Sequence, residues 1–352
     1  MIIARTPFRV SFFGGGTDYP VWRTEHPGAV IATTINKYCY ISCRWLPPFF
    51  EHKSRIVWSQ IERVKDHAQI QHPAVRAALQ FLRIHSGIEL HHNADLPART
   101  GLGSSSSFTV GLLHALYGLK GQMPSKAQLA TDAIRIEQDV LREHVGSQDQ
   151  IMAAFGGLNR IDFPTDGTFR VSPIIVNEER RTLLQEHLML VFTGLSRTAS
   201  EVAAEQVQAT PKKTQELRAM YQMVNEAIRV LEGDEDLATF GRLLHEGWQL
   251  KRSLTTRIST PEVDELYDAA RRVGAIGGKL LGAGGGGFLL LFARPDDQDA
   301  IRRALKAFLC VPFQFEDGGS RVIFYEPEAS HRSSDRSTRQ PHLVSTGAHR
   351  DA

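Results

Sequence analysis

Apolar and polar positions in the first half of the chain alternate between strand-like and helix-like periods. Strands are predicted over residues 5–13, 29–34, 38–45 and 88–96, and helices over residues 73–85 and 108–119. Ser125 and Gln128 form a capping box that opens a further helix, expected to run to about Glu143. A turn at residues 146–148 leads into a short helix that ends at Gly156 and Gly157.

The second half begins with a predicted strand at residues 188–193 and continues with two helices. The first has apolar residues at helical spacing from Leu217 to Leu231, and the second covers about residues 237–252. Thr260 and Pro261 open another helix, which is expected to end near Val273. The remaining predictions are a helix over residues 298–308 and strands over 288–293, 312–316 and 321–325.

Composition suggests two soluble domains. The chain has 352 residues, of which 42% are hydrophobic and 23% charged, and Pro164 and Gly167 mark a plausible hinge within residues 162–169. We therefore expect domains at residues 1–165 and 166–328. Residues 329–352 are rich in Ser, Arg and His and nearly lack apolar residues, so a disordered tail is expected.

Charge and cysteine usage exclude several classes of protein. A net charge of +2 gives no general attraction to nucleic acid, and no stretch approaches the roughly 18 apolar residues of a membrane span. The three cysteines include no Cys-x-x-Cys pair, which argues against a zinc site or a disulfide framework. We expect a cytoplasmic protein that binds neither nucleic acid nor membranes.

A glycine-containing turn joins the strand at 88–96 to the helix at 108–119. It reads Leu-Pro-Ala-Arg-Thr-Gly-Leu-Gly-Ser-Ser-Ser-Ser from residue 96 to residue 107. Glycines let the backbone approach phosphate oxygens, a helix start favours negative charge, and serine hydroxyls can cap the helix or reach magnesium. This turn is a candidate phosphate-binding loop, although no Gly-Lys-Ser/Thr follows as in a Walker loop. The alternative is a flexible turn with a serine N-cap.

Two acidic residues and a second glycine run add to this pattern. Glu137 lies on the apolar stripe of its helix, where a carboxylate needs a cation or hydrogen bonds, and a structural salt bridge is the alternative. Asp149 lies in a glycine-initiated turn directly before a helix, where a helix cap or an Asx-turn is the alternative. Residues 282–287 read Gly-Ala-Gly-Gly-Gly-Gly, but a strand follows them, so they do not form a dinucleotide fingerprint. Such a run permits close approach to a ligand or to another segment of the chain.

Taken in order, residues 5–19, 97–107 and 282–287 resemble the three motifs of the GHMP kinases. This superfamily is named after galactokinase and the homoserine, mevalonate and phosphomevalonate kinases, and the likeness covers about residues 2–325. The resemblance implies an α+β fold of two domains. The N-terminal domain would have a left-handed βαβ crossover, against the usual right-handed rule, and the C-terminal domain would be ferredoxin-like.

The resemblance also implies ATP and Mg²⁺ and a role for each motif. Asp149 would accept the proton of the attacking hydroxyl, and Arg9 beside it would keep that carboxylate ionised and stabilise developing charge. Ser105 and Glu137 would hold magnesium. The ATP phosphates would lie on Gly101, Leu102, Gly103, Ser104, Ser105 and Ser106. The acceptor would lie on Gly16, Thr17, Asp18, Gly284, Gly285 and Arg197.

The first motif narrows the acceptor within the superfamily. Galactokinases carry Gly-Glu-His before Thr-Asp-Tyr, whereas residues 14–16 are all glycine here. This feature looks most like the D-glycero-D-manno-heptose 7-phosphate kinases, which phosphorylate the anomeric oxygen, and fucokinases are the alternative. Cations for the second phosphate could be Arg197 or the Lys251-Arg252 pair, whose alternative is an ordinary surface position.

The expected partners are a sugar phosphate and ATP, and the protein would be a monomer or a homodimer. A catalytically dead sensor of the same fold is the alternative from another class. Loss of Arg9, Glu137 or Asp149 would mark such a sensor, and all three residues are present.

Overall fold

The computed structural model describes residues 1–98, 100–194 and 199–326, and these residues form two sheets. The larger sheet has nine strands and contains both the start and the end of the described chain. Its main path is β13-β1-β2-β5-β3-β4, while β6 and β12 pair with β2, and β7 pairs with β6. The strands are β1 (Ile2–Phe13), β2 (Gly28–Trp45), β3 (Ser54–Val57), β4 (Ile61–Val64), β5 (Ile88–Ala94), β6 (Leu158–Phe163), β7 (Arg170–Pro173), β12 (Phe315–Glu316) and β13 (Arg321–Tyr325).

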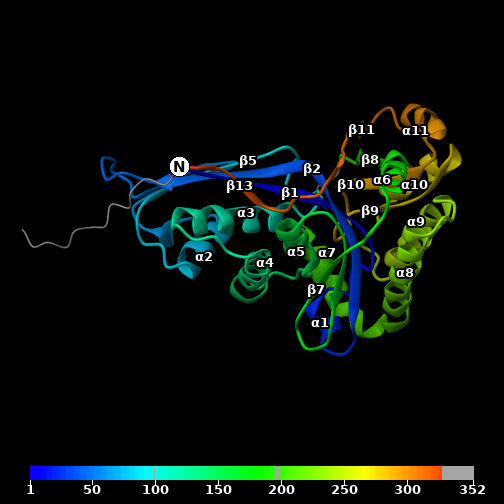
Figure 1. Ribbon diagram of the computed structural model, residues 1–352, viewed down its shortest axis with the longest axis horizontal. Coiled ribbons are helices and arrows are strands. Elements are labelled where there is room, and N and C mark those ends of the chain that lie inside the picture. The colour runs from blue at the N-terminus through cyan, green and yellow to red at the C-terminus, as the bar shows by residue number, and fades with distance from the viewer. Residues whose placement is uncertain (99, 195–198, 327–352) are drawn as a thin grey trace, which may run out of the picture.

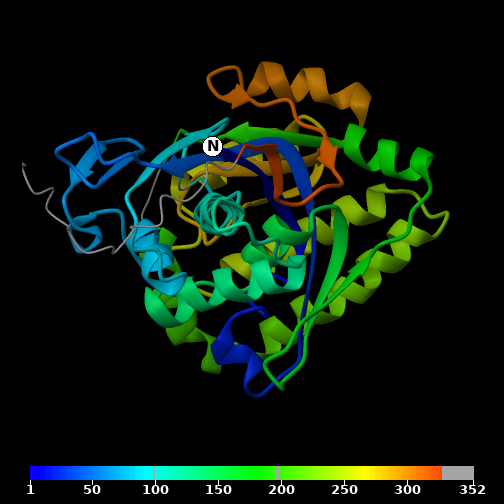
Figure 2. The ribbon, with the colours of Figure 1, turned by 60° about the vertical axis from the view of Figure 1, so that its left-hand side comes forward.

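Helices cover one side of this sheet, as Figure 1 shows, and the turned view of Figure 2 again places them beneath the long strands β1 and β2. They are α2 (Pro73–Phe81), α3 (Ser104–Leu119), α4 (Lys126–Ile134) and α5 (Gln148–Phe155). Helix α3 is buried along almost its whole length against β1 and β2. A helix that is apolar all round needs cover on every side, which explains its central position.

The smaller sheet has four described strands in the order β11-β8-β10-β9, all paired antiparallel. They are β8 (Leu188–Phe192), β9 (Ala275–Leu280), β10 (Phe288–Ala293) and β11 (Leu309–Cys310). Numbered along the chain, this order is 4-1-3-2, the order of a ferredoxin-like sheet, as expected. Its helices are α8 (Thr214–Glu232), α9 (Ala238–Arg252), α10 (Pro261–Arg272) and α11 (Gln298–Ala304). The handedness of the N-terminal crossover stays a prediction.

The remaining described elements are short. They are α1 (Pro20–Arg23), η1 (His67–Gln69), η2 (Arg135–Val140), α6 (Glu178–Glu186), α7 (Ala199–Ala209), η3 (Thr210–Lys212) and η4 (Pro295–Asp297). No helix in the described part of the chain is long and apolar enough to cross a membrane. The tail expected at 329–352 lies outside the described residues.

The expected hinge at residues 162–169 is instead a hairpin turn. Asp162 of β6 pairs with Arg170 of β7, so this segment joins two strands of the larger sheet. Its proline and glycine serve the turn: Gly167 has φ +82°, and the Asp166 carboxylate accepts the Thr168 N–H at 2.9 Å.

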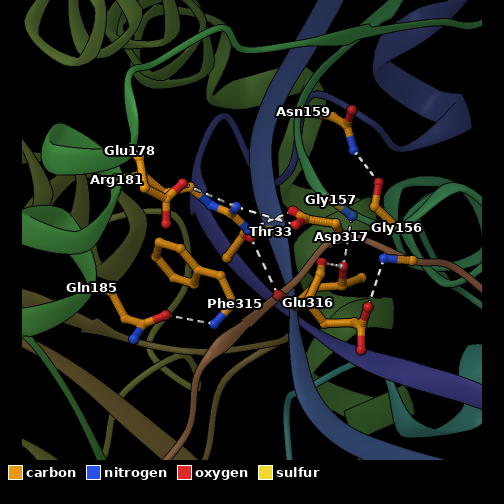
Figure 3. Close-up of polar contacts among 12 residues, drawn as sticks. Thr33, Gly156, Gly157, Asn159, Glu178, Arg181, Gln185, Phe315, Glu316 and Asp317 are labelled. Atoms are coloured by element: carbon orange, nitrogen blue, oxygen red, sulfur yellow. Dashed lines mark hydrogen bonds and ion pairs between the residues drawn. The ribbon is translucent and has the colours of Figure 1, made fainter.

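The two sheets are also not built from two successive parts of the chain. A boundary at residue 165 assigns β12 and β13 to the second domain, whereas β12 pairs with β2 and β13 pairs with β1. Figure 3 shows how α6 contacts the segment at residues 315–317: Arg181 pairs with Asp317, and the Gln185 amide oxygen accepts the Phe315 N–H at 2.7 Å. The last strands of the chain therefore complete its first sheet.

The helix predicted from Ser125 to about Glu143 changes character halfway. Ser125 caps it as expected, because its Oγ accepts the Gln128 N–H at 3.1 Å. The Gln128 side chain bonds Asp132 instead of returning to the cap. After Ile134 the backbone widens into the π-helical η2, which contains Glu137. Such wide turns are frequent at functional sites, and this one carries the buried carboxylate.

Two glycine segments hold the sheets together by contact between their backbones. A Cβ on Gly101 would lie 2.3 Å from the Leu281 carbonyl oxygen, and a Cβ on Gly282 would lie 2.4 Å from Gly101 Cα. Phe288 donates its N–H to the Thr100 carbonyl at 3.1 Å. The run at 282–287 therefore serves close packing of chain segments, one of the two purposes that its sequence allows.

We predict that Gly282→Ala destabilises the protein far more than Gly167→Ala does. Both glycines have a left-handed φ, near +76° and +82°, so both substitutions should cost about 1–2 kcal/mol from backbone strain. A Cβ at Gly167 meets open space, whereas at Gly282 it meets the Gly101 backbone and should cost about 1–3 kcal/mol more. Urea unfolding of both variants measures the difference, and equal losses would contradict the interlocked junction.

Candidate active site

The loop at residues 101–103 shapes a helix start that no side chain caps. Gly101 and Gly103 have left-handed φ values of +83° and +74°, and Gly103 is the N-cap of α3 without a side-chain bond. Leu102 is buried, and its carbonyl accepts the Arg9 N–H at 3.0 Å. The alternative of a serine N-cap is therefore not supported. A helix start with these properties is suited to an anion.

Arg9 and Asp149 form a two-pronged ion pair beside this loop. Arg9 donates from Nε to Oδ1 and from Nη2 to Oδ2, both at 2.7 Å. Its Nη1 donates to the Gly101 carbonyl at 2.6 Å, so the same guanidinium holds the acid and the loop. The Asp149 side chain is 24% exposed, which leaves it accessible from solvent.

The carboxylate of Asp149 also touches the phosphate-loop candidate. A Cβ on Gly103 would lie 3.3 Å from Asp149 Oδ2, so this carboxylate and the loop are neighbours. Asp149 is the second residue of α5 and is not its cap, so the helix-cap alternative is not supported. Arg9 and Asp149 are thus brought together as expected.

Glu137 points its carboxylate toward the start of α3. Its Oε2 accepts from Ser106 Oγ at 2.9 Å and from Gln150 Nε2 at 2.5 Å. Its Oε1 is buried and has no partner among the described residues. Burial raises the pKa of Glu137 to about 7. The alternative of a structural salt bridge is not supported, because the contacts of Glu137 are neutral hydroxyl and amide groups.

The hydroxyl on Glu137 is that of Ser106, whereas Ser105 was expected. Ser105 is exposed at the start of α3. A buried hydroxyl next to a carboxylate oxygen without a partner is the oxygen-rich environment that a hard cation requires. The chemistry of this donor set therefore fits Mg²⁺, with Glu137, Ser106 and the neighbouring Ser105 as the residues that could hold it.

The turn at residues 14–18 is held together by its own side chains. Thr17 is buried, and its hydroxyl donates toward the Gly14 carbonyl at 2.8 Å and accepts the Ala29 N–H at 3.1 Å. Asp18 is also buried, and its oxygens accept the N–H groups of Gly16 at 3.0 Å and Gln148 at 3.2 Å. Burial raises the pKa of Asp18, and the charge of Asp149 contributes. These groups shape the turn, and their contact with an acceptor stays a prediction.

The other residues expected at the acceptor are placed differently. Gly285 donates its N–H to the Ile258 carbonyl at 3.0 Å, and a Cβ on Gly284 would lie 2.7 Å from Ile258. Both glycines therefore pack against the segment that precedes α10. Arg197 lies outside the described residues. Ser11 and Gln148, which sequence reasoning missed, bond each other at 2.7 Å beside Gly15.

The Lys251-Arg252 pair divides into one residue at the site and one away from it. Arg252 donates to Asp264 at 2.7 Å within the second half of the chain. Lys251 is buried and donates to the Gly282 carbonyl. Lys279 of β9 is a second buried lysine, missed in the sequence, which donates to the Phe12 carbonyl at 2.8 Å. The signal in the sequence is a single lysine between two glycines and two leucines, at residues 277–281.

A cavity of about 550 Å³ lies elsewhere. Phe155 at the end of α5, Ile174 and the paired Arg181 and Asp317 are among its lining, and none of Arg9, Glu137 or Asp149 takes part. The Arg9–Asp149 pair and the loop beside it therefore lie outside this cavity.

Comparison with known proteins agrees with this arrangement. Residues 70–157 match the N-terminal domain of the GHMP kinases, and residues 223–309 match the C-terminal domain. A D-glycero-alpha-D-manno-heptose 7-phosphate kinase of Campylobacter jejuni is 27% identical over 321 residues, 87% of this chain and 93% of that protein. An L-fucokinase/L-fucose-1-P guanylyltransferase of Bacteroides fragilis is 26% identical over 86% of this chain, which spans 35% of that longer protein.

A solved structure shows the same fold. The D-glycero-D-manno-heptose 1-phosphate kinase of Bacteroides thetaiotaomicron superposes with a TM-score of 0.73 at 24% identity, over 92% of this chain and 98% of that one. Both domain matches, the order of the three motifs and the assembled Arg9–Asp149 pair lead to one conclusion. The chain belongs to the GHMP kinases, phosphotransferases that act on an alcohol group.

Proposed function

We propose that this protein transfers the γ-phosphoryl group of ATP to the anomeric hydroxyl of D-glycero-D-manno-heptose 7-phosphate and forms the 1,7-bisphosphate. The observation that carries the chemistry is the Arg9–Asp149 pair in contact with the loop at residues 101–103. The similarity to the Campylobacter jejuni heptose 7-phosphate kinase over nearly its whole length supports the substrate. A non-catalytic sensor is not favoured, because Arg9, Glu137 and Asp149 are all present and lie around the loop at residues 101–106.

In the proposed reaction the base and the loop divide the work. Asp149 accepts the proton of the sugar hydroxyl as its oxygen bonds the γ-phosphorus. The bond from that phosphorus to the β,γ-bridging oxygen breaks, and ADP leaves with the electron pair. Arg9 keeps the Asp149 carboxylate aimed at the loop through its two bonds. The helix start at Gly103 binds the phosphates through its amides and its dipole.

The magnesium site would be built by residues of η2 and α3. Glu137 and Ser106 would hold the ion, together with the exposed hydroxyl of Ser105. Magnesium supplies positive charge to the phosphate oxygens when it is bound. Filling this site would also give Glu137 Oε1 the partner that it lacks.

The acceptor would bind at Gly15, the one glycine of this turn that no other side chain approaches closely. A Cβ on Gly15 would have only Gln148 Nε2 at 3.7 Å and Ser11 Oγ at 3.8 Å as close neighbours, so Ser11 and Gln148 are the polar groups available to a sugar there. A heptose is larger than galactose, and residues 14–16 lack the Glu-His of galactokinases. Fucose is the second candidate, because the fucokinase relative covers 86% of this chain at 26% identity.

A panel of acceptors tests the substrate. We expect kcat/KM for heptose 7-phosphate to exceed the values for free heptose, fucose and galactose by at least about 10², because a site built for a charged group rejects analogues that lack it. ADP release with each sugar is the measurement, and the product should carry two phosphates. Faster turnover of fucose would overturn the heptose assignment and favour the second candidate.

Asp149→Asn should lower kcat by about 10²–10⁴ and leave the Kd for ATP within a few-fold, because the base contacts the acceptor and not the nucleotide. Single-turnover kinetics and calorimetry measure the two quantities. Asp166→Asn, in the distant hairpin turn, is the matched control and should keep the wild-type rate. An active Asp149→Asn enzyme would remove the base from the mechanism.

Glu137→Gln should change how pH and magnesium affect stability. Burial raises the folded-state pKa from 4.5 to about 7, so the folded protein holds this proton after the unfolded chain has released it. The stability that the neutral acid contributes is therefore fully present below pH 4.5 and is lost as pH rises to about 7. Without metal, the melting temperature of Glu137→Gln relative to wild type should rise over this range.

Magnesium should raise the melting temperature of the wild type at pH 8 and should need about tenfold higher concentration to stabilise Glu137→Gln. Thermal shift with increasing Mg²⁺ is the measurement. Asp139→Asn, an exposed acid on the same turn, is the control and should behave as wild type. Equal magnesium dependence in Glu137→Gln would make Glu137 a purely structural residue.

A further inference from the structure

Two lysines are buried at the junction of the sheets without a carboxylate partner. Lys251 ends α9 and Lys279 lies in β9, and each is 6% exposed. Each donates to a backbone carbonyl, Lys251 to Gly282 and Lys279 to Phe12. Among the described residues, neither lysine has an acid within ion-pair distance, in contrast to Arg9 and Asp149. A buried cation without a counter-ion is costly, which makes such a residue a candidate for binding an anion.

Lys251 is connected to the phosphate loop through one backbone contact. Its ammonium donates to the carbonyl of Gly282. Gly282 packs directly on Gly101, because a Cβ on Gly282 would lie 2.4 Å from Gly101 Cα. The carbonyl of Gly101 in turn accepts from Arg9 Nη1 at 2.6 Å. Lys251 and Arg9 are therefore anchored on the two facing loop segments of the same junction.

The charges at the junction leave Lys251 available to a ligand. Arg9 has committed Nε and Nη2 to Asp149 and has one bond from Nη1 to Gly101, so its charge is matched by that carboxylate. Lys251 uses one of three ammonium protons on Gly282. Its contact with Gly282, which packs on Gly101, puts Lys251 beside the loop that Arg9 also contacts. The group that must pass between the loop and Asp149 is the anionic phosphoryl group.

Granting the proposed kinase reaction, we infer that Lys251 is a further catalytic residue, whose ammonium binds the non-bridging oxygens of the phosphoryl group during its transfer. Lys251 gives up no proton: the hydroxyl proton passes to Asp149, and the bond to the bridging oxygen breaks as before. The charge on the three equatorial oxygens is then stabilised from the second half of the chain by Lys251 and from the first half by the helix start at Gly103.

The same arrangement predicts a loss of activity in alkali. Burial, with the charge of Arg9, lowers the pKa of Lys251 from 10.5 to about 8, against the opposing effects of Asp18 and Asp149. The charge of Lys251 in turn contributes to lowering the pKa of Lys279, the other buried lysine of the junction. The ammonium of Lys251 is therefore present at neutral pH and is lost as pH rises through about 8, and the rate should fall with it.

Lys251→Met tests the inference because methionine fills the volume without the charge. We expect kcat to fall by about 10²–10³, as when one oxyanion donor is removed, with KM for the acceptor within a few-fold. The decline of kcat above pH 8 should disappear. The melting temperature should not fall, because an unpaired buried cation has been removed, and Lys251→Arg should recover part of the rate.

Arg252→Met is the matched control, since it removes the neighbouring cation from the same helix end. Arg252 pairs with Asp264 at 2.7 Å and lies 6.0 Å from the Trp248 ring centre, so its loss should lower stability and leave kcat unchanged. An unchanged kcat in Lys251→Met would overturn the inference. A rise confined to KM for the sugar phosphate would also overturn it, and would place Lys251 at the phosphate that the acceptor already carries.

Nucleotide affinity separates this inference from the choice of acceptor. By calorimetry in magnesium, Lys251→Met should bind ATP about tenfold more weakly than wild type and bind ADP equally well, because only ATP has the γ-phosphoryl group. This difference holds whichever sugar is the substrate, so failure of the heptose assignment leaves it intact. Equal losses for ATP and ADP would contradict a contact with the γ-phosphoryl group.

Discussion

The contact between the backbones of the loop at 101–103 and the run at 282–287 is the constraint on which the site depends. Any side chain at Gly101 or Gly282 would separate the two segments. The contact places two carbonyls at the centre of the molecule, that of Gly101 holding Arg9 and that of Gly282 holding Lys251. The positions of both cations therefore follow from the absence of side chains.

Residues around this contact were predictable where their chemistry conflicts with their surroundings. An acid on an apolar stripe identified Glu137, and a loop of glycine and serine before an apolar helix identified residues 101–106. The partner of Glu137 was not predictable, because adjacent serines differ only in the direction that a helix start gives them, and Ser106 points inward. Asp18 and Thr17 were expected to face a ligand, but sequence cannot show that their neighbours are backbone amides.

Strands and helices with strong periodicity were predicted close to their observed bounds, among them α8, α9, α10 and β10. The strand β9 was missed because it contains Gly277 and Gly278, which normally disfavour strands. Gly277 is there because a Cβ would lie 1.8 Å from the Gly241 carbonyl of α9. The hinge was wrong for a related reason, since proline and glycine mark a hairpin turn as readily as a linker. The local sequence does not show which distant segment of the chain packs against a glycine.

The pairing of β13 with β1 has a consequence for folding during synthesis of the protein. Ile2 leaves the ribosome long before its partner Tyr325, which is made after nearly all the rest of the described chain. Until then one edge of β1 exposes backbone groups that could pair with another nascent chain. The other strands of the first sheet can pack around α3 early, but this edge is covered only after β13 has been made. The first sheet is therefore complete only after all described strands of the second sheet have been synthesised.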